Sequence, residues 1–265
     1  MTDVQRARLY DAVVAAPHDD APRLAMADLL DRQGDPWGTF IRAQLALTSA
    51  ARRGAKAEAV RRRDEADQLR RQHDKGWMNG IDALVNLCTF NRGFVEKVSV
   101  TPHQYISHVD ELFRRAPLRF LVLSDIGDRL ASILQNPRVS QLVSLYIGNR
   151  SGQTIGDAGL TAIATCPYLG GLKVLEVPKQ DIGMAGLEAL CASRQLPSLL
   201  YVNLRGNQVE DPREGYGTDW ATGEVERSGA YLPPLGYELE AKYGELPWLH
   251  GPSRLVNYPP WMEEL

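Results

Sequence analysis

Several residue types and patterns are scarce in this chain, and each absence excludes a class of protein. It contains only three cysteines, Cys88, Cys166 and Cys191, which are too few and too scattered for a disulfide framework or a zinc site. No apolar run approaches the roughly 20 residues that a membrane-spanning helix requires, and the first residues lack the apolar stretch of a signal peptide. The formal net charge of −3 gives no general attraction to nucleic acid or anionic lipid. We therefore expect a cytoplasmic protein with no membrane partner.

Sequence motifs for catalysis are also missing. The chain has no P-loop, no G-x-G-x-x-G, no G-x-S-x-G and no H-E-x-x-H. Neither Cys166 nor Cys191 has a histidine within 50 residues in sequence that could activate its thiol. His103 and His108 are spaced i, i+5, which does not place two metal ligands on one helical face. We predict no catalytic residue, no cofactor and no metal site.

One apolar pattern, L-x-x-L-x-L, occurs five times along the chain. Consecutive copies are 23, 24, 30 and 27 residues apart. Self-similarity at such a period is typical of proteins that stack one structural unit on the next. The apolar positions of the five copies are Val95/Val98/Val100, Leu118/Leu121/Leu123, Leu142/Leu145/Ile147, Leu172/Leu175/Val177 and Leu199/Val202/Leu204.

A second apolar register keeps a constant distance from the first. Two apolar side chains, spaced i, i+3, stand twelve and nine residues before each of the last four strands, as one face of a short helix requires. Each repeat is therefore a strand, a turn, a helix and a return turn, and it buries its apolar face only when stacked. We predict an α/β fold, a short solenoid of parallel strands with outer helices. The helix pairs are Ile106/Val109, Leu130/Ile133, Leu160/Ile163 and Leu187/Leu190.

The segments IGDAGLTAIA and IGMAGLEALC resemble leucine-rich repeats of the longer, helix-bearing kind found in ribonuclease inhibitor. Asn207 stands where these repeats usually carry asparagine, and Gln180 replaces it one repeat earlier. Ile126 and Arg150 occupy the position in the earlier repeats, so those turns depart from the family pattern. The resemblance implies a curved strand face on which function usually resides.

The first 78 residues are predicted to be helical. The string DDAPRLAMADLLDRQGDPWGTFIRAQLAL, which begins at Asp19, is similar to a bacterial repeat-companion domain, a small helical module that commonly precedes leucine-rich repeats. The resemblance covers roughly residues 5–210 and implies a fold and an interaction role rather than a reaction. Four charged residues in the string admit two interpretations, an ionic binding site or ion pairs and caps that hold the helices together, and we favour the second. They are Arg23, Asp28, Asp35 and Arg42.

Three domains are predicted: a helical module (1–78), a repeat array (79–210) and a segment rich in proline and aromatic residues (211–265). The last segment holds seven of the sixteen prolines and three of the five tryptophans. Disorder would predict few aromatic residues, so we expect an irregular but ordered cap or tail that packs on the last repeat or reaches a partner. Candidate binding residues in it are Trp248, His250, Tyr258 and Trp261.

The third and fifth positions of each strand pattern should face away from the helices, because neighbouring residues of a strand alternate. Several of these positions are apolar or aromatic, and an exposed patch of that kind usually marks an interaction site. The open alternative is that the chain covers this patch itself. The candidate binding residues are Phe120, Val122, Tyr146, Val174, Glu176, Tyr201, Asn203 and Arg205.

The leading hypothesis is a non-enzymatic interaction module (an adaptor, scaffold or inhibitor-like subunit) that binds a protein or peptide through the strand face and the C-terminal tail. One alternative is an enzyme or enzyme subunit with a site between tail and repeats, built for instance from Tyr216, Asp219 and His250. A second is nucleic-acid binding through a basic helix at 52–75. Nine Lys or Arg residues there accompany five Asp or Glu, which favours a solvated helix.

Overall fold

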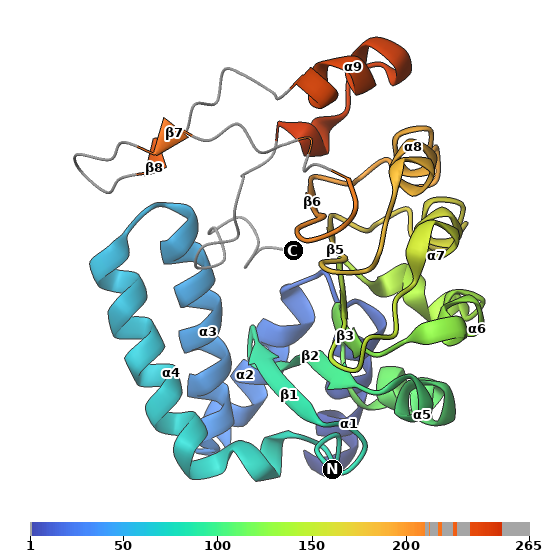
Figure 1. The fold of residues 1–265 in the computed structure, drawn as a ribbon. Helices are drawn as coiled ribbons and strands as arrows, with labels where there is room; N and C mark the ends of the chain where they lie inside the picture. Colours follow the sequence, from blue (N-terminus) through green and yellow to red (C-terminus); the bar gives the residue numbers. More distant parts are fainter. Residues whose placement is uncertain (1, 210–211, 213–216, 219–224, 227–233, 251–265) are drawn as a thin grey trace. The chain divides into compact units, whose positions relative to one another are not determined.

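The structure is a computed structural model that describes residues 2–209, 212, 217–218, 225–226 and 234–250 (Figure 1). These residues form an α/β protein with nine α-helices and a six-stranded sheet. The strands follow one another across the sheet in chain order, from the first to the sixth. They are β1 (Leu87–Asn91), β2 (Phe94–Val100), β3 (Phe120–Ser124), β4 (Ser144–Gly148), β5 (Val174–Glu176) and β6 (Tyr201–Asn203).

The sheet is mostly parallel, with one antiparallel pair at its start. β1 pairs antiparallel with β2, whereas β4, β5 and β6 pair in parallel. The chain divides into two compact units, and the boundary lies within β3, between Val122 and Leu123.

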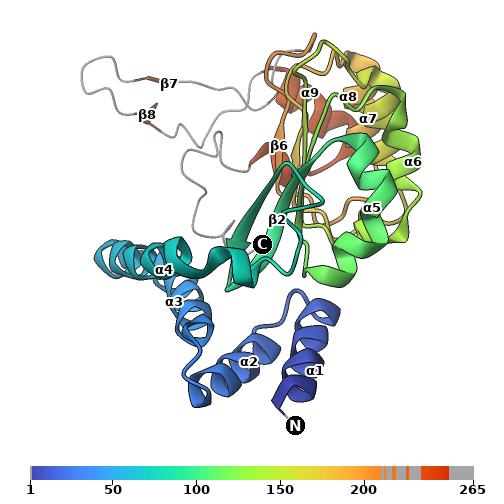
Figure 2. The ribbon, with the colours of Figure 1, turned by 90° about the horizontal axis from the view of Figure 1, so that it is seen from below.

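The first 78 residues, which were predicted to be helical, form four helices. Asp35 caps α3 by accepting a hydrogen bond from the Trp37 N–H at 3.0 Å, and Pro36 fills the first helical position, where no N–H is needed. Gly34, with φ of +68°, follows the end of α2. Figure 2 shows α1 beside α2, and α3 beside α4. The helices are α1 (Thr2–Ala15), α2 (Ala21–Arg32), α3 (Pro36–Arg52) and α4 (Lys56–Trp77).

The β1–β2 hairpin packs against α3 in the first unit. The rings of Phe40 and Phe90 meet edge to face with centroids 5.4 Å apart. At the hairpin tip Gly93 has φ of +89°, and a Cβ there would lie 2.4 Å from Cγ1 of Ile41, so a side chain would prevent this approach. The Trp37 indole Nε1 donates to the Gly93 carbonyl at 2.8 Å. The hairpin therefore shares a core with the helices that precede it.

The α5 helix (Pro102–Arg115) buries a different face from the one predicted. Thr101 and Gln104 form a capping box at its start. Tyr105 and Leu112 are almost fully buried, whereas Ile106 is 44% exposed. The expected pair Ile106/Val109 is therefore wrong as the core face of this helix. The helix spans 14 residues, long enough for its buried face to be set by residues seven apart rather than by one short pair.

Strands and helices alternate through the second unit. In Figure 1, α6, α7 and α8 follow one another along one side of the parallel strands. Leu145, Leu175 and Val202 are direct partners in parallel register and are buried, which confirms their predicted alignment. The elements between the strands are η1 (Gly127–Arg129), α6 (Leu130–Leu134), η2 (Pro137–Gln141), α7 (Gly156–Ala164) and α8 (Met184–Cys191).

The helix register of the second unit is also confirmed. The apolar pairs of α6, α7 and α8 are all at most 3% exposed. Each pair turns toward the sheet because residues three apart share one helical face. The pairs are Leu130/Ile133, Leu160/Ile163 and Leu187/Leu190.

Two amide side chains join successive turns at the ends of the strands. Oδ1 of Asn207 accepts from the N–H groups of Gln180 and Ile182 at 2.7 and 3.2 Å. Its Nδ2 donates to the Val177 carbonyl at 2.9 Å. One segment earlier, Nε2 of the buried Gln180 donates to the Ile147 carbonyl at 3.1 Å. Both amides therefore satisfy backbone groups that the strand ladder leaves unpaired.

A recurring turn leads into the strands of the second unit, and it recurs once more near the C-terminus. In each case the backbone N–H of an apolar residue donates to the carbonyl of the apolar residue three positions earlier. The fourth instance follows α9 (Pro234–Tyr243) and includes η3 (Pro247–Leu249), so residues 234–250 continue the succession of helix and turn. The donor and acceptor pairs are Leu142/Val139, Leu172/Leu169, Leu199/Leu196 and Leu249/Leu246.

Residues 234–250 pack on α8 and on β6, the last strand of the six-stranded sheet. α9 lies beside α8, where the Lys242 ammonium is 2.7 Å from a Glu188 carboxylate oxygen, and η3 lies beside β6. A short antiparallel pair, β7 (Gly217–Thr218) and β8 (Val225–Glu226), forms a separate sheet. None of the helices in the described ranges is long and apolar enough to cross a membrane.

Candidate functional site

Parallel register in the second unit lines up side chains from three successive strands. One line is Ser144, Val174 and Tyr201, and two residues further along each strand comes a second line, Tyr146, Glu176 and Asn203. We call the second line the strand-face row. Its three members are half-buried, so each reaches solvent in part. Adjacent strands are about 4.8 Å apart, so the row offers three neighbouring groups to one ligand.

The Tyr146 ring lies over Gly148 at the end of its own strand. A Cβ at Gly148 would lie 2.9 Å from Cε1 of Tyr146 and 3.6 Å from its hydroxyl oxygen. The missing side chain therefore makes room for the ring. The ring is a nearly fixed apolar platform that retains a polar hydroxyl.

Asn203 is oriented by hydrogen bonds on both sides. Its Nδ2 donates to Oε2 of Glu176 at 3.2 Å, and its Oδ1 accepts from the backbone N–H of Arg205 at 3.1 Å. The Arg205 side chain is exposed two residues beyond the row. The Glu176 carboxylate and the Asn203 amide are therefore neighbours at the carboxyl ends of β5 and β6, and Arg205 follows Asn203 by two residues.

Three of the predicted face residues are buried, which agrees with the alternative that the chain covers this part of the face itself and not with an exposed patch at these positions. Val174 is 0% exposed, Tyr201 is 3% exposed and Phe120 is 7% exposed, while Val122 is half-buried. Strand alternation sets the face on which a side chain lies but not whether another segment covers it. For Tyr201 the structure gives one such segment, because η3 packs beside β6. For Phe120, the guanidinium carbon of Arg119 lies 5.7 Å from the ring centroid.

The C-terminal candidates separate into three groups. Trp248 is only 3% exposed and forms part of the packing of η3. Nε2 of His250 is 2.7 Å from Oε1 of Glu240, so this ring is held by a carboxylate on α9. Tyr258 and Trp261 lie outside the described residues, as do Tyr216 and Asp219 of the enzyme alternative.

The cysteine thiols are placed for packing rather than for nucleophilic chemistry. Burial, assisted by Glu188, raises the pKa of the Cys191 thiol to about 12. Burial followed by the charges of Asp82 and Asp74 raises the pKa of Cys88. Protonated thiols are weak nucleophiles and weak metal ligands at neutral pH. Among the described residues no group of three or more His, Cys, Asp or Glu could hold a metal ion.

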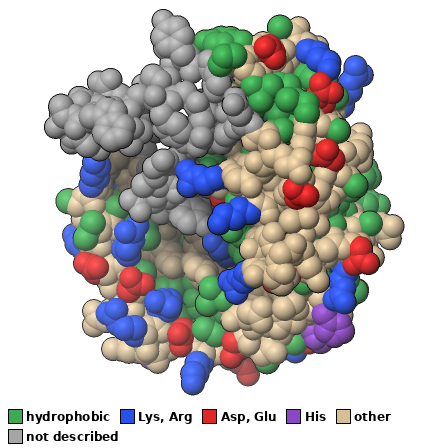
Figure 3. Space-filling view, viewed as in Figure 1, with side chains coloured by type: hydrophobic (Ala, Val, Ile, Leu, Met, Phe, Trp, Pro, Cys, Tyr) green, Lys and Arg blue, Asp and Glu red, His purple; other side chains and the backbone are tan. Residues whose placement is uncertain are grey.

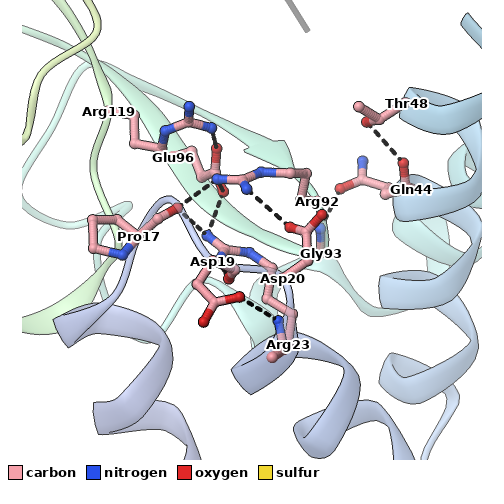
Figure 4. A network of polar contacts seen from close by, with 11 residues as sticks. Pro17, Asp19, Asp20, Arg23, Gln44, Thr48, Arg92, Gly93, Glu96 and Arg119 are labelled. Carbon is pink, nitrogen blue, oxygen red and sulfur yellow. Dashed lines mark hydrogen bonds and ion pairs between the residues drawn. The ribbon is translucent and has the colours of Figure 1, made fainter. Parts of the chain in front are cut away.

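A cluster of buried charges lies in the first unit, around Glu96 on β2 (Figure 4). Its carboxylate is 2.6 Å from Nη2 of Arg23 on α2, 2.8 Å from Nη2 of Arg92 and 3.4 Å from Nη1 of Arg119. Arg23 and Arg92 also donate to the Pro17 carbonyl. Burial lowers the pKa of Arg119 to about 10, although Glu96 acts in the opposite direction. The Arg119 guanidinium therefore remains charged at neutral pH.

Each of the four charged residues singled out in the N-terminal string has a charged partner. Besides the Arg23–Glu96 pair, Arg6 and Asp35 are 3.0 Å apart, and Arg42 contacts both Asp28 and Asp31. These contacts join the helices to one another and α2 to β2. They support ion pairs that hold the module together, in preference to an ionic binding site.

The basic helix α4 carries charges of both signs. Arg62 and Glu65 are 2.9 Å apart, and Arg70 and Asp67 are 3.6 Å apart, both at i, i+3 spacing. In the space-filling view, Lys and Arg side chains are interspersed with Asp and Glu over the α3–α4 side (Figure 3). A surface of mixed sign attracts phosphates less than a continuous basic stripe does.

No protein-family model matches the chain, and searches of curated proteins and of solved structures find no match either.

Three groups that shape these sites were not identified from sequence. Gly148 follows Tyr146 at a strand end, and a glycine in that place is a sign of close approach. Glu96 follows Phe94 and Val95 in the largely apolar strand FVEKVSV, and a carboxylate buried in such a strand needs a charged partner. Arg119 was equally detectable, because it directly precedes the apolar run FLVL.

Proposed function

We propose that this chain is a leucine-rich repeat protein with an N-terminal module of the bacterial repeat-companion type. Three features of the second unit support this: strands in parallel register, helices along one side of them, and the amide bridges of Asn207 and Gln180. The buried ion pair between Arg23 on α2 and Glu96 on β2 fits a helical companion attached to the first strands. The free thiols of Cys88, Cys166 and Cys191 suit a reducing compartment, and we place the protein in the cytoplasm.

The proposed activity is non-enzymatic binding of a protein or peptide, in the manner of an adaptor, scaffold or inhibitor-like subunit. The observation that carries this proposal is the strand-face row of Tyr146, Glu176 and Asn203, with Arg205 beyond it. Three successive strands contribute one partly exposed group each, so a ligand lying across the strands meets all three.

The chemistry of the row suits an extended peptide. The Tyr146 ring offers an apolar surface to a side chain and a hydroxyl to a backbone group. Glu176 and Asn203 offer acceptors and a donor to peptide N–H and C=O groups. Arg205 is exposed and can pair with a carboxylate at the rim of such an interface.

Site-specific photo-crosslinking tests the proposal directly. A benzophenone-bearing amino acid replaces Tyr146, and the matched control replaces Tyr168, which is 38% exposed outside the row. The expected result is a discrete crosslinked partner at position 146 that is absent at position 168. Loss of that crosslink in an Arg205→Glu background supports binding at the row.

The opposite results are equally clear. The same set of crosslinked proteins at both positions would mean that the row has no selectivity. A partner that is identified by its crosslink at 146, but whose binding to the Tyr146→Ala and Arg205→Glu chains without the crosslinker is unchanged, would contradict the assigned contacts.

A further inference from the structure

The turns that follow β4, β5 and β6 in the second unit each carry one exposed cation. These cations are Arg150, Lys179 and Arg205, and we call the three turns the basic turns. Within the part of the chain that the structure describes, no salt bridge involves any of the three side chains. Their charges therefore remain available to a ligand.

Hydrogen bonds and a close approach join the basic turns to one another. Nδ2 of Asn149, the residue before Arg150, donates to the Lys179 carbonyl at 3.0 Å. The Lys179 N–H donates in turn to the Arg205 carbonyl at 2.9 Å. A Cβ at Gly206 would lie 2.9 Å from Cγ of Lys179. The glycine therefore makes room for the lysine side chain to approach the turn that carries Arg205.

The strand-face row lies next to the basic turns. Asn203 accepts a hydrogen bond from the backbone N–H of Arg205 at 3.1 Å, and it is the strand partner of Glu176, three residues before Lys179. The Tyr146 ring lies over Gly148, so it extends along β4 toward the turn that follows this strand. An apolar ring and two cations therefore lie at the same end of three neighbouring strands.

The spacing of these groups suits an extended peptide. Adjacent strands are about 4.8 Å apart, so one strand spacing separates the end of β4, where the Tyr146 ring lies, from the turn that carries Lys179. In an extended segment, side chains two residues apart lie on the same side at a separation of about 6.6 Å. A ligand residue on the ring and another on the lysine would therefore be two positions apart.

The charges near the basic turns favour a peptide over a nucleic acid. Asp125 accepts from two backbone N–H groups and lies near the Arg150 charge, and Asp181 accepts from a side-chain amide at 2.6 Å. Glu176 is a member of the row itself. These three carboxylates would oppose a continuous line of phosphates, whereas a single carboxylate placed at Lys179 and Arg205 meets two cations.

We propose that the strand-face row and the basic turns together bind an extended acidic segment of another protein. An aromatic side chain of the segment packs on the Tyr146 ring, and an Asp or Glu two residues later pairs with Lys179 and Arg205. The inference rests on the proposed function of the row and adds to it the kind of peptide that binds.

A synthetic probe tests the carboxylate and its spacing separately. The probe is the acetylated, amidated pentapeptide serine–tryptophan–serine–glutamate–serine, titrated into the full chain and followed by amide NMR shifts. We expect saturable shifts centred on Tyr146, Lys179 and Arg205. One control peptide has glutamine in place of glutamate, and another has glutamate directly after tryptophan. Each control should bind about fivefold more weakly.

Charge-neutralising variants test the assigned cations. Lys179→Gln and Arg205→Gln should each weaken the glutamate peptide by about threefold to fivefold and leave the glutamine peptide unchanged. Arg194→Gln makes the same change of charge at an exposed position in the turn that precedes β6, and it serves as the matched control. Equal weakening by all three variants would reduce the effect to net charge and overturn the proposal.

Three further results would overturn the inference. Equal binding of the glutamate and glutamine peptides, with shifts at Tyr146, would exclude carboxylate recognition while leaving the row as a binding surface. Tighter binding of an oligothymidylate at Lys179 and Arg205 would make these turns a phosphate site. The absence of saturable shifts with the glutamate peptide would reject the acidic segment, and the crosslink at position 146 would still decide the proposed function independently.

Discussion

Arg23 and Glu96 form an ion pair with 2.6 Å between Nη2 and Oε1, and neither side chain has any solvent exposure. The pair joins α2 to β2 within the first unit, across 73 residues of sequence. A buried pair of this kind is not by itself a large source of stability, because desolvation offsets much of the attraction. It instead makes each partner depend on the other, since either charge alone would be buried without compensation.

Replacing Glu96 should therefore be costly. Glu96→Gln leaves three arginines around a neutral side chain, and we expect a loss of about 3–5 kcal/mol in the free energy of unfolding, measured by urea denaturation. Asp28→Asn is the control, because the Asp28–Arg42 pair is largely exposed and should change stability by less than about 1 kcal/mol. Equal effects of the two variants would contradict the role assigned to burial.

The amide bridge at Asn207 should contribute measurably to the second unit. Asn207→Ala removes the acceptor for two N–H groups and a donor to the Val177 carbonyl, and we expect a loss of about 1–3 kcal/mol. The neighbouring Gln208→Ala removes one exposed hydrogen bond, to Asp181, and should cost less than about 0.5 kcal/mol. Urea denaturation of both variants decides the matter, and a negligible effect at Asn207 would mean that water replaces the bridge.

The strand-face row can be disturbed without changing any of its residues. Gly148→Ala places a Cβ 2.9 Å from the Tyr146 ring, so the ring must move while the strand remains. We expect the partner crosslinked at position 146 to bind several-fold more weakly, with a stability change of about 1 kcal/mol or less. Gly171→Ala is the control, because its nearest atom is 3.8 Å away. If Gly148→Ala left partner binding unchanged, the position of the Tyr146 ring would not contribute to binding.

We expect Asp125 to contribute stability to the second unit that is lost at acid pH. Backbone N–H groups of Ser151 and Arg150 donate to its carboxylate at 2.7 Å and hold its pKa below the usual value. A depressed pKa means that the stabilisation is present above the unfolded-state value near 3.8 and is lost as pH falls through the lower folded-state value. Asp125→Asn should show a shallower loss of stability on acidification, measured by thermal unfolding between pH 2.5 and 6. An unchanged slope would show that other carboxylates account for the acid sensitivity.

Periodicity was enough to predict the parallel strand register and the buried helix pairs of the second unit, and the limits of that prediction are physical. Leu145, Leu175 and Val202 lie in register because a constant spacing between apolar helix pairs and apolar strands forces successive segments to stack. The same rule fails at Ile106, where a longer helix selects another face. The same periodicity predicts the start of the sheet only in part. Val95 and Val98 lie in a strand as predicted, but the antiparallel pairing of β2 with β1 was not predicted.

The sequence by itself determined which residues can share a face, since helices and strands have fixed periods and apolar side chains leave water. It determined the α/β class, the helices of the first 78 residues, and the order of strands and helices after them. Only the tertiary structure decided which of those faces stay open. Val174 and Tyr201 are buried, and Glu96 pairs with Arg23 from 73 residues away, because burial depends on which distant segments come together. The local sequence pattern does not predict those long-range contacts.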